Sequence, residues 1–204
     1  MTTPRNRMVS IWVSAISFNH RANTMHPFIG SRQIQRTSLL LFCLLPGSLY
    51  ADVTYQAPRD FLRAVFGGKL PPARMIWITG KRRDQVEKIL GHRPRTLRLR
   101  YWARQGKRAW ILEDIGKERL ITTGIVVAGQ RIAQMKVLIY RESRGSEVHY
   151  PFFMEQFRGA GLSTAERLDR PIDGISGATL SVRALKRLAR LALYLSRQLE
   201  ETHK

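Results

Sequence analysis

The stretch "LITTGIVVAGQRIAQMKVLIYRES", residues 120–143, consists of two apolar runs on either side of Gly129-Gln130. Two runs of strand length, rich in Val and Ile and separated by a short Gly-containing turn, are typical of a β-hairpin. We therefore predict a strand, a tight turn and a second strand here. The elements on both sides are assigned relative to this hairpin.

Upstream of the hairpin the same period of two continues. "TLRLRYWAR" (96–104) alternates apolar residues with arginines, and "RAWILED" (108–114) follows after Gly106-Lys107. Alternation of this kind is typical of a half-buried strand, here with an arginine-rich face. The middle of the chain is thus predicted to be an antiparallel meander of three or four strands.

Helical patterns flank the meander. Pro58 occupies a helix-starting position, Gly67-Gly68 ends that helix, and Gly91 ends the next one. The expected helices are "PRDFLRAVFGGK" (58–69), "GKRRDQVEKILGH" (80–92), "YPFFMEQFRG" (150–159) and "TLSVRALKRLARLALYLSRQLEE" (179–201), with a strand-like "ARMIWIT" (73–79) between the first two. We predict a single α+β domain with an antiparallel or mixed central sheet, flanking helices and a long C-terminal helix.

The formal net charge of the chain is +20 at pH 7. Such a balance suits nucleic acid, an anionic membrane surface or an acidic partner. The arginines are spread over strands and helices, and no zinc-finger, RRM or KH motif is present, so we expect no nucleic-acid partner. A solvated basic surface without a dedicated polyanion site is the simpler interpretation of the charge.

The first 51 residues resemble a leader. They contain basic but no acidic residues, and "RTSLLLFCLLPGSLYADV" (36–53) combines a charge, a short apolar run and a small-residue cleavage site after Ala51. We expect a signal peptide and a periplasmic location, with residues 1–24 as an over-long start and Met25 as the alternative initiator. A buried helix is the other interpretation of the apolar run.

Several kinds of chemistry are not expected. Cys43 is the only cysteine and lies in the predicted leader, so the processed chain would have neither a disulfide nor a thiol nucleophile. His92 and His149 lack metal-ligand spacing, and we expect no metal site. No Gly-x-Ser-x-Gly elbow indicates a hydrolase.

A loop after the last predicted strand is a candidate ligand site. Glu142, Ser143 and Gly145 begin it, and Phe152, Phe153 and Phe157 follow in the short aromatic helix. The glycine would let backbone N–H groups face a ligand, while the rings would offer flat apolar contacts. An ordinary surface loop before a core-facing helix is the alternative.

The second candidate is "DGISGATL", residues 173–180, at the start of the last helix. Gly174 and Gly177 leave room above the backbone. Thr179 stands where the unpaired N–H groups and the positive end of the helix favour a phosphate, and Arg183 and Lys186 add charge nearby. Thr179 as a plain N-cap is the alternative, because Ser and Thr open many helices.

The segment 173–179, Asp-Gly-x-Ser-Gly-Ala-Thr, resembles the flavinylation motif of the FMN-binding domain family. That family includes the flavin-bearing periplasmic subunits of sodium-pumping NADH:quinone oxidoreductase and of Rnf-type complexes. The resemblance covers roughly residues 95–200, although Ser143-Arg144 replaces the Thr-Pro of the family loop. It implies that FMN is attached to the threonine hydroxyl through a phosphodiester by a flavin transferase that uses FAD and magnesium.

Carried over to this chain, the resemblance implies a set of cofactor-binding residues. Thr179 would be the covalent attachment site, and the others would be recognition or contact residues: Asp173, Gly174, Ser176, Gly177, Ala178, Glu142, Ser143 and Gly145. Arg141, Arg144 and Arg183 are candidates for stabilising the negative charge of a reduced flavin.

The expected protein is a periplasmic electron-transfer flavoprotein with covalent FMN, and a redox carrier is favoured over an enzyme with its own turnover. Its partners would be a flavin transferase, a membrane-bound electron donor and an unknown acceptor. We expect a leader (1–51), an N-terminal helix–strand–helix part of the same domain (52–94) and the FMN-binding domain (95–200). A cofactor-free basic binding or assembly protein and a flavin reductase acting on a small acceptor remain alternatives.

Overall fold

The computed structural model describes residues 52–202. The predicted leader and its cleavage site at Ala51 therefore lie outside the described residues. Within them the elements are β1 (Val53–Thr54), α1 (Pro58–Val65), β2 (Ala73–Trp77), α2 (Gly80–Leu90), β3 (Arg98–Arg104), β4 (Lys107–Ile115), β5 (Leu120–Ala128), β6 (Arg131–Tyr140), the 3₁₀ turn η1 (Ser146–His149), α3 (Pro151–Met154), η2 (Glu155–Phe157) and α4 (Thr179–Glu201).

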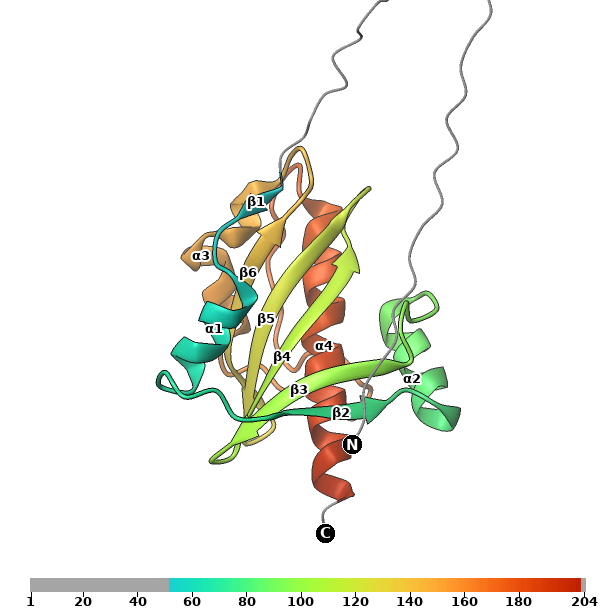
Figure 1. The fold of residues 1–204 in the computed structure, drawn as a ribbon. Coiled ribbons are helices and arrows are strands. Elements are labelled where there is room, and N and C mark those ends of the chain that lie inside the picture. Colours follow the sequence, from blue (N-terminus) through green and yellow to red (C-terminus); the bar gives the residue numbers. More distant parts are fainter. Residues whose placement is uncertain (1–51, 203–204) are drawn as a thin grey trace, which may run out of the picture. The chain divides into compact units, whose positions relative to one another are not determined.

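The strands form one six-stranded antiparallel sheet in the order β1-β6-β5-β4-β3-β2 (Figure 1). The predicted meander corresponds to β3–β6, and β2 and β1 extend it at its two edges. Because β2 pairs with β3, the segments 52–94 and 95–200 share one sheet. The expected single α+β domain with a long C-terminal helix is confirmed.

Helix boundaries follow the local sequence signals. Pro58 is the first residue of α1, where its missing N–H has no intrahelical role, and Gly91, with a φ of 75°, is the C-cap that follows the last residue of α2, Leu90. Among the described residues, no helix combines the length and the apolarity that a membrane crossing requires. The predicted helix at 150–159 forms as two short pieces, α3 and η2.

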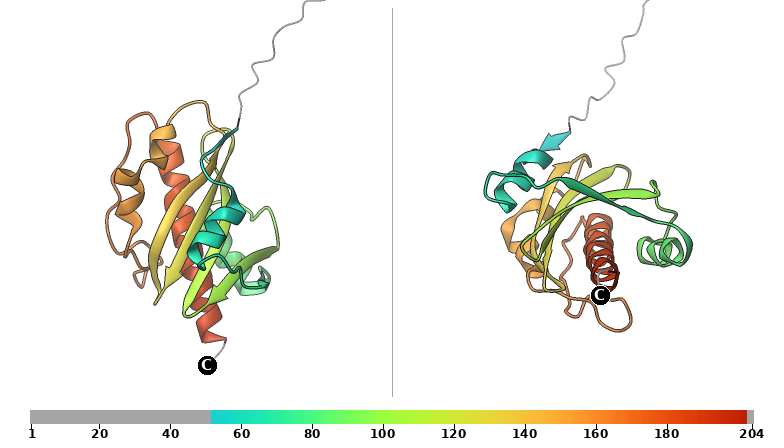
Figure 2. Two further views of the ribbon diagram at one scale, coloured as in Figure 1. Left: turned by 60° about the vertical axis from the view of Figure 1, so that its left-hand side comes forward. Right: turned by 60° about the horizontal axis from the view of Figure 1, so that its bottom comes forward.

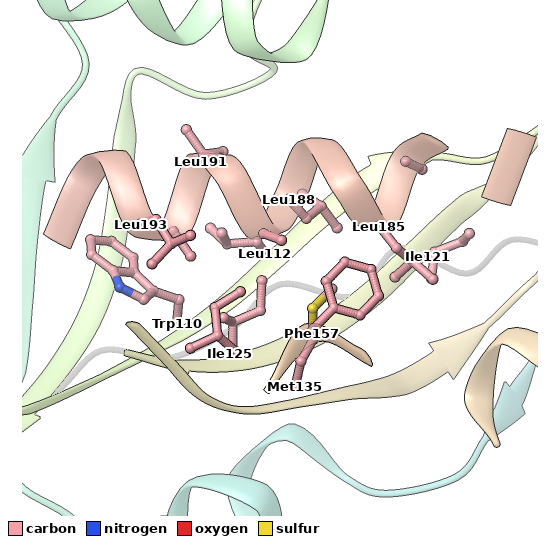
Figure 3. Packing of buried hydrophobic residues seen from close by; sticks show 14 of the residues in the cluster. Trp110, Leu112, Ile121, Ile125, Met135, Phe157, Leu185, Leu188, Leu191 and Leu193 are labelled. Carbon is pink, nitrogen blue, oxygen red and sulfur yellow. The ribbon is translucent and has the colours of Figure 1, made fainter. Parts of the chain in front are cut away.

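The larger core lies between α4 and one face of the sheet, which curls around the helix (Figure 2). Leu185 and Leu188 of α4 are fully buried and point toward Ile125 and Met135 of the strands (Figure 3). The Trp110 indole is also buried, and its Nε1 donates a 2.9 Å hydrogen bond to Ser196 Oγ of α4. Apolar burial holds the helix on the sheet, and this polar contact fixes its position along the strands.

A smaller core lies on the opposite face, beneath α1. Phe61 and Leu62 of α1 pack with Val126 and Leu138 of the sheet. A Cβ on Gly124 of β5 would lie 2.6 Å from the Phe61 ring, so the ring occupies the space above this glycine. The sheet is therefore covered by α1 on one face and by α4 on the other.

Sheet register determines which loops meet. Ile115 of β4 pairs with Leu120 of β5, and Ile121 of β5 pairs with Tyr140 of β6. Antiparallel neighbours thus bring the β4–β5 turn and the loop after β6 to the same end of the sheet. The N-terminus of α4 lies at that end as well, since Tyr140 contacts Ser181 of its first turn.

Candidate functional site

Thr179 is the first residue of α4, and Ala178 occupies the N-cap position. The N-cap interpretation of Thr179 is therefore wrong, and the alanine at the cap makes no side-chain hydrogen bond. Thr179 is exposed while Ala178 is buried. The helix therefore begins without a side-chain cap for its first N–H groups, and a hydroxyl stands beside them.

Ala178 packs against Gly145 of the loop that follows β6. A Cβ placed on Gly145 would lie 2.8 Å from the Ala178 Cβ and 3.2 Å from its Cα. Gly145 also has a φ of 79°, in the left-handed region. The loop and the start of α4 therefore meet at a contact that accepts only small residues on both sides.

Tyr140 fastens the same two segments from inside the protein. Its hydroxyl donates to the carbonyl of Arg144 at 2.6 Å and lies 3.0 Å from Ser181 Oγ. Because the phenol has one proton, the Ser181 hydroxyl is the donor in the second contact. Burial raises the pKa of Tyr140, so the phenol stays neutral and keeps that proton.

Glu142 organises the turn between β4 and β5. Its Oε1 accepts hydrogen bonds from the backbone N–H groups of Lys117, Glu118 and Arg119, at 2.5, 2.9 and 3.0 Å. Successive N–H groups that converge on one oxygen form an anion-binding concavity, and this side chain fills it. Glu142 thus shapes the site by holding the turn in place.

These three segments surround a surface cavity of about 760 Å³. This volume lies within the usual range of ligand pockets, about 300–1,000 Å³. The cavity is lined by Lys117, Glu118, Glu142, Ser143, Arg144, Gly177, Ala178, Thr179, Leu180 and Ser181. A phosphate at Thr179 would lie at the helix N-terminus, and the rest of a ligand would extend between the turn and the loop.

The cavity unites five of the nine residues that the sequence analysis assigned to the cofactor, namely Glu142, Ser143, Gly177, Ala178 and Thr179. Gly145 lies behind it, against Ala178. Asp173, Gly174 and Ser176 are outside the lining and exposed on the segment before the helix.

The charges around the cavity are more balanced than the sequence suggested. Lys117 and Arg144 line it together with Glu118 and Glu142. Arg141, expected near the flavin, instead binds Asp52 at 2.9 Å and Thr122 at 2.8 Å and is not among the lining residues.

The two basic residues of the first turns of α4, Arg183 and Lys186, have different environments. Lys186 donates to the carbonyl of Ile172 at 2.6 Å, so it secures the approach to the helix. Arg183 is exposed. Much of the attraction for an anion here therefore comes from the helix end itself.

The aromatic residues after the loop have divided roles. Phe153 and Phe157 are fully buried and pack edge to face, with their ring centroids 5.7 Å apart. Phe152 is 65% exposed. Two of the three rings proposed as flat ligand contacts thus belong to the core, as in the alternative interpretation.

Sequence reasoning missed the turn residues Lys117 and Glu118, which line the cavity. A signal for them was present. In an antiparallel meander alternate connections lie at the same end of the sheet, so the β4–β5 turn had to lie beside the loop after β6. Ser181, just beyond the candidate stretch 173–180, lines the cavity as well.

The structure thus combines an α+β fold with a surface cavity at the N-terminus of its long C-terminal helix. Residues 116–194 match the model of the FMN-binding domain, the family that the resemblance predicted. The match contains all the residues that line the cavity. No curated protein and no solved structure matches the chain.

Proposed function

We propose that the protein is an exported electron-transfer flavoprotein that holds FMN through a phosphodiester bond to Oγ1 of Thr179. One observation carries this proposal: an exposed threonine hydroxyl stands at an uncapped helix N-terminus, inside a cavity of suitable size within the FMN-binding domain. The leader-like sequence of residues 1–51 supports export.

The residues around Thr179 fit a phosphate-linked cofactor. A phosphate on Thr179 would lie beside the first N–H groups of α4, and the positive end of the helix would favour its charge. The contact of Gly145 with Ala178 sets the direction from which the chain enters the helix. Lys117 and Arg144 supply positive charge beside the ligand.

The exposed segment 173–177 supports modification by a separate transferase, which must reach the hydroxyl before the cofactor is in place. In this reaction Thr179 Oγ1 bonds to the flavin-side phosphorus of FAD, the phosphoanhydride bond breaks, AMP leaves and the hydroxyl proton is released. Covalent attachment would keep the cofactor on the protein outside the cytoplasm.

When bound, FMN supplies the electron-transfer chemistry, and the protein positions it and adjusts its charge environment. The proposed donor is a membrane-bound reductase, and the acceptor is a second redox partner. The basic chain would guide docking to an acidic partner. Turnover of a small acceptor by the reduced protein, measured at steady state, would instead identify a flavin reductase.

The test is co-expression with a flavin transferase, followed by denaturing electrophoresis and detection of flavin fluorescence in the gel. We expect a fluorescent wild-type band and none for Thr179→Val, which keeps the shape of the side chain but has no hydroxyl. Thr179→Ser, the matched control, keeps a hydroxyl and should retain fluorescence. A fluorescent Thr179→Val band would place the attachment elsewhere, and a wild-type protein without visible flavin absorbance would favour the cofactor-free alternative.

A further inference from the structure

The sheet opens between β3 and β4. The two strands pair only from Tyr101 opposite Trp110 to Arg104 opposite Lys107, next to their hairpin turn. Beyond that point Arg98–Arg100 pair with β2, and Ile111–Glu113 pair with β5. Figure 1 shows the two strands separating as they leave the turn. Such a gap needs side chains or a ligand to fill it.

A cavity of about 690 Å³ lies at this opening. Its apolar lining comes from elements on both faces of the sheet: Leu62 of α1, Leu90 of α2 and Leu191 of α4, together with Trp102 and Ile111 of the strands. A volume of this size would accept an alkyl chain or a small ring system.

Four arginines also line the cavity: Arg59, Arg95, Arg98 and Arg100. Within residues 52–202, none of the four forms an ion pair with a carboxylate, whereas nine other arginines do. Arg98 lies over the Trp77 ring, 5.7 Å from its centroid, and this contact leaves its charge uncompensated. The guanidinium groups therefore form a positive border around an apolar interior.

The cavity lining carries little negative charge, and its carboxylate is already bound by other residues of the protein. Glu113 is the one carboxylate among its described lining residues, and it accepts a 2.5 Å hydrogen bond from Thr122 Oγ1 and lies 3.8 Å from Arg141. His92 is a further lining residue, and its Nε2 lies 2.8 Å from Asp114 Oδ1. Neither residue neutralises the four arginines.

The cavity is separate from the flavin site. It shares no lining residue with the cavity at Thr179, and all its lining residues except Leu191 precede residue 116, where the FMN-binding domain begins. The part of the chain that the domain match leaves out therefore builds a site of its own.

We propose that this cavity binds an amphiphilic anion, a molecule with an alkyl chain or aromatic body and one carboxylate or phosphate group. Burial of the apolar part removes surface from water on both sides, which contributes roughly 25 cal/mol per Å². Guanidinium groups bind carboxylate and phosphate through paired N–H donors. A neutral apolar ligand would leave the arginines without partners, and a small hydrophilic anion would leave the apolar walls in contact with water.

Calorimetric titration of the purified protein with decanoate tests the site. Two further probes separate its features: 1-decanol has the alkyl chain without the charge, and inorganic phosphate has negative charge without the alkyl chain. We expect saturable binding of one decanoate per chain, at least about tenfold weaker binding of decanol, equivalent to about 1.4 kcal/mol, and no saturable binding of phosphate. Absence of saturable decanoate binding, or equal affinity for decanoate and decanol, would overturn the proposal.

Variants locate the binding to this cavity. Arg98→Gln combined with Arg100→Gln should weaken decanoate binding about tenfold or more and leave decanol unchanged. Arg74→Gln, an exposed arginine of β2 outside the cavity, is the control with the same kind of charge change and should bind as wild type. Ile111→Trp should fill the cavity and abolish binding of both probes, with circular dichroism to verify folding. If the double arginine variant binds decanoate as tightly as wild type does, the proposal is wrong.

Two sources of the ligand share this chemistry, a free fatty acid and an anionic lipid in a membrane. Co-sedimentation with phosphatidylglycerol vesicles that decanoate competes away would identify a membrane lipid, whereas decanoate binding without vesicle binding would identify a free acid. Thr179→Val should bind decanoate as wild type does, so the result is independent of the flavin site.

Discussion

At the scale of single residues, the motif at 173–179 was recognisable in the sequence, but the packing behind it was not. Thr is a favoured N-cap residue, and Thr179 precedes a clear helical pattern, which made the cap interpretation reasonable. In the structure Ala178 takes that position, because only a small side chain fits against Gly145. A contact between residues 33 positions apart has no local sequence signal.

The contact between Gly145 and Ala178 predicts a specific sensitivity. Gly145→Ala introduces a Cβ at a φ of 79° and 2.8 Å from another Cβ, so it should destabilise the protein and reduce flavin incorporation. Gly106→Ala is the matched control, because Gly106 has a φ of 74° and nothing within 4 Å. We expect Gly145→Ala to lower the free energy of unfolding by about 1–3 kcal/mol more than Gly106→Ala does. Equal losses in urea titrations would contradict the close contact.

At the scale of elements, periodicity was sufficient to place every strand of the meander and both glycine-terminated helices. The period of two located β3–β6, and the glycines at 67 and 91 lie within two residues of the last residues of α1 and α2. Glu142 was assigned to the cofactor from the sequence, whereas in the structure its side chain holds the β4–β5 turn. Its contacts with the β4–β5 turn depend on which loops share an end of the sheet, and this requires the register as well as the strand pattern.

Glu142 should therefore control the order of the turn. Glu142→Gln keeps one neutral oxygen acceptor but loses the charge that three N–H groups share, and hydrogen bonds to charged groups contribute about 1.5–3 kcal/mol. We expect faster amide hydrogen exchange at Lys117–Arg119 in Glu142→Gln, and little change in the centre of β5. Unchanged exchange at the turn would show that the turn is held by other contacts.

At the scale of the whole molecule, one buried carboxylate joins three distant segments. Asp114 of β4 has a fully buried side chain and accepts hydrogen bonds from His92 after α2, at 2.8 Å, and from Arg187 of α4, at 2.6 Å. From the sequence, His92 was considered only as a metal ligand, and its spacing from His149 argued against that role. The strand and helix patterns could not show that His92, Asp114 and Arg187 meet at one carboxylate, because this depends on how the elements pack.

This arrangement predicts a pH dependence of stability. His92 Nδ1 faces the carbonyl of Arg93 and Nε2 faces Asp114, and two acceptors are satisfied together only by the protonated ring. The hydrogen bond to the Arg93 carbonyl, followed by Asp114, raises the pKa of His92, although burial and Arg187 oppose the rise.

Because the folded pKa lies above the unfolded value of about 6.5, the stabilisation is complete below that value and is lost as the pH rises through the folded pKa. The advantage of the wild type over His92→Gln in urea midpoint should therefore be larger at about pH 5.5 than at about pH 8.5. An advantage that is constant or grows with pH would contradict the protonated state.

The central claim is that Thr179 is the residue that carries FMN, and peptide mapping tests it most directly. Trypsin should release residues 168–183 as one peptide, since Arg170 precedes Pro171, and this peptide contains the hydroxyls of Ser176, Thr179 and Ser181. For protein co-expressed with a flavin transferase, fragment mass spectra are predicted to place one FMN on Thr179. An unmodified peptide, or FMN on Ser176 or Ser181, would contradict the account.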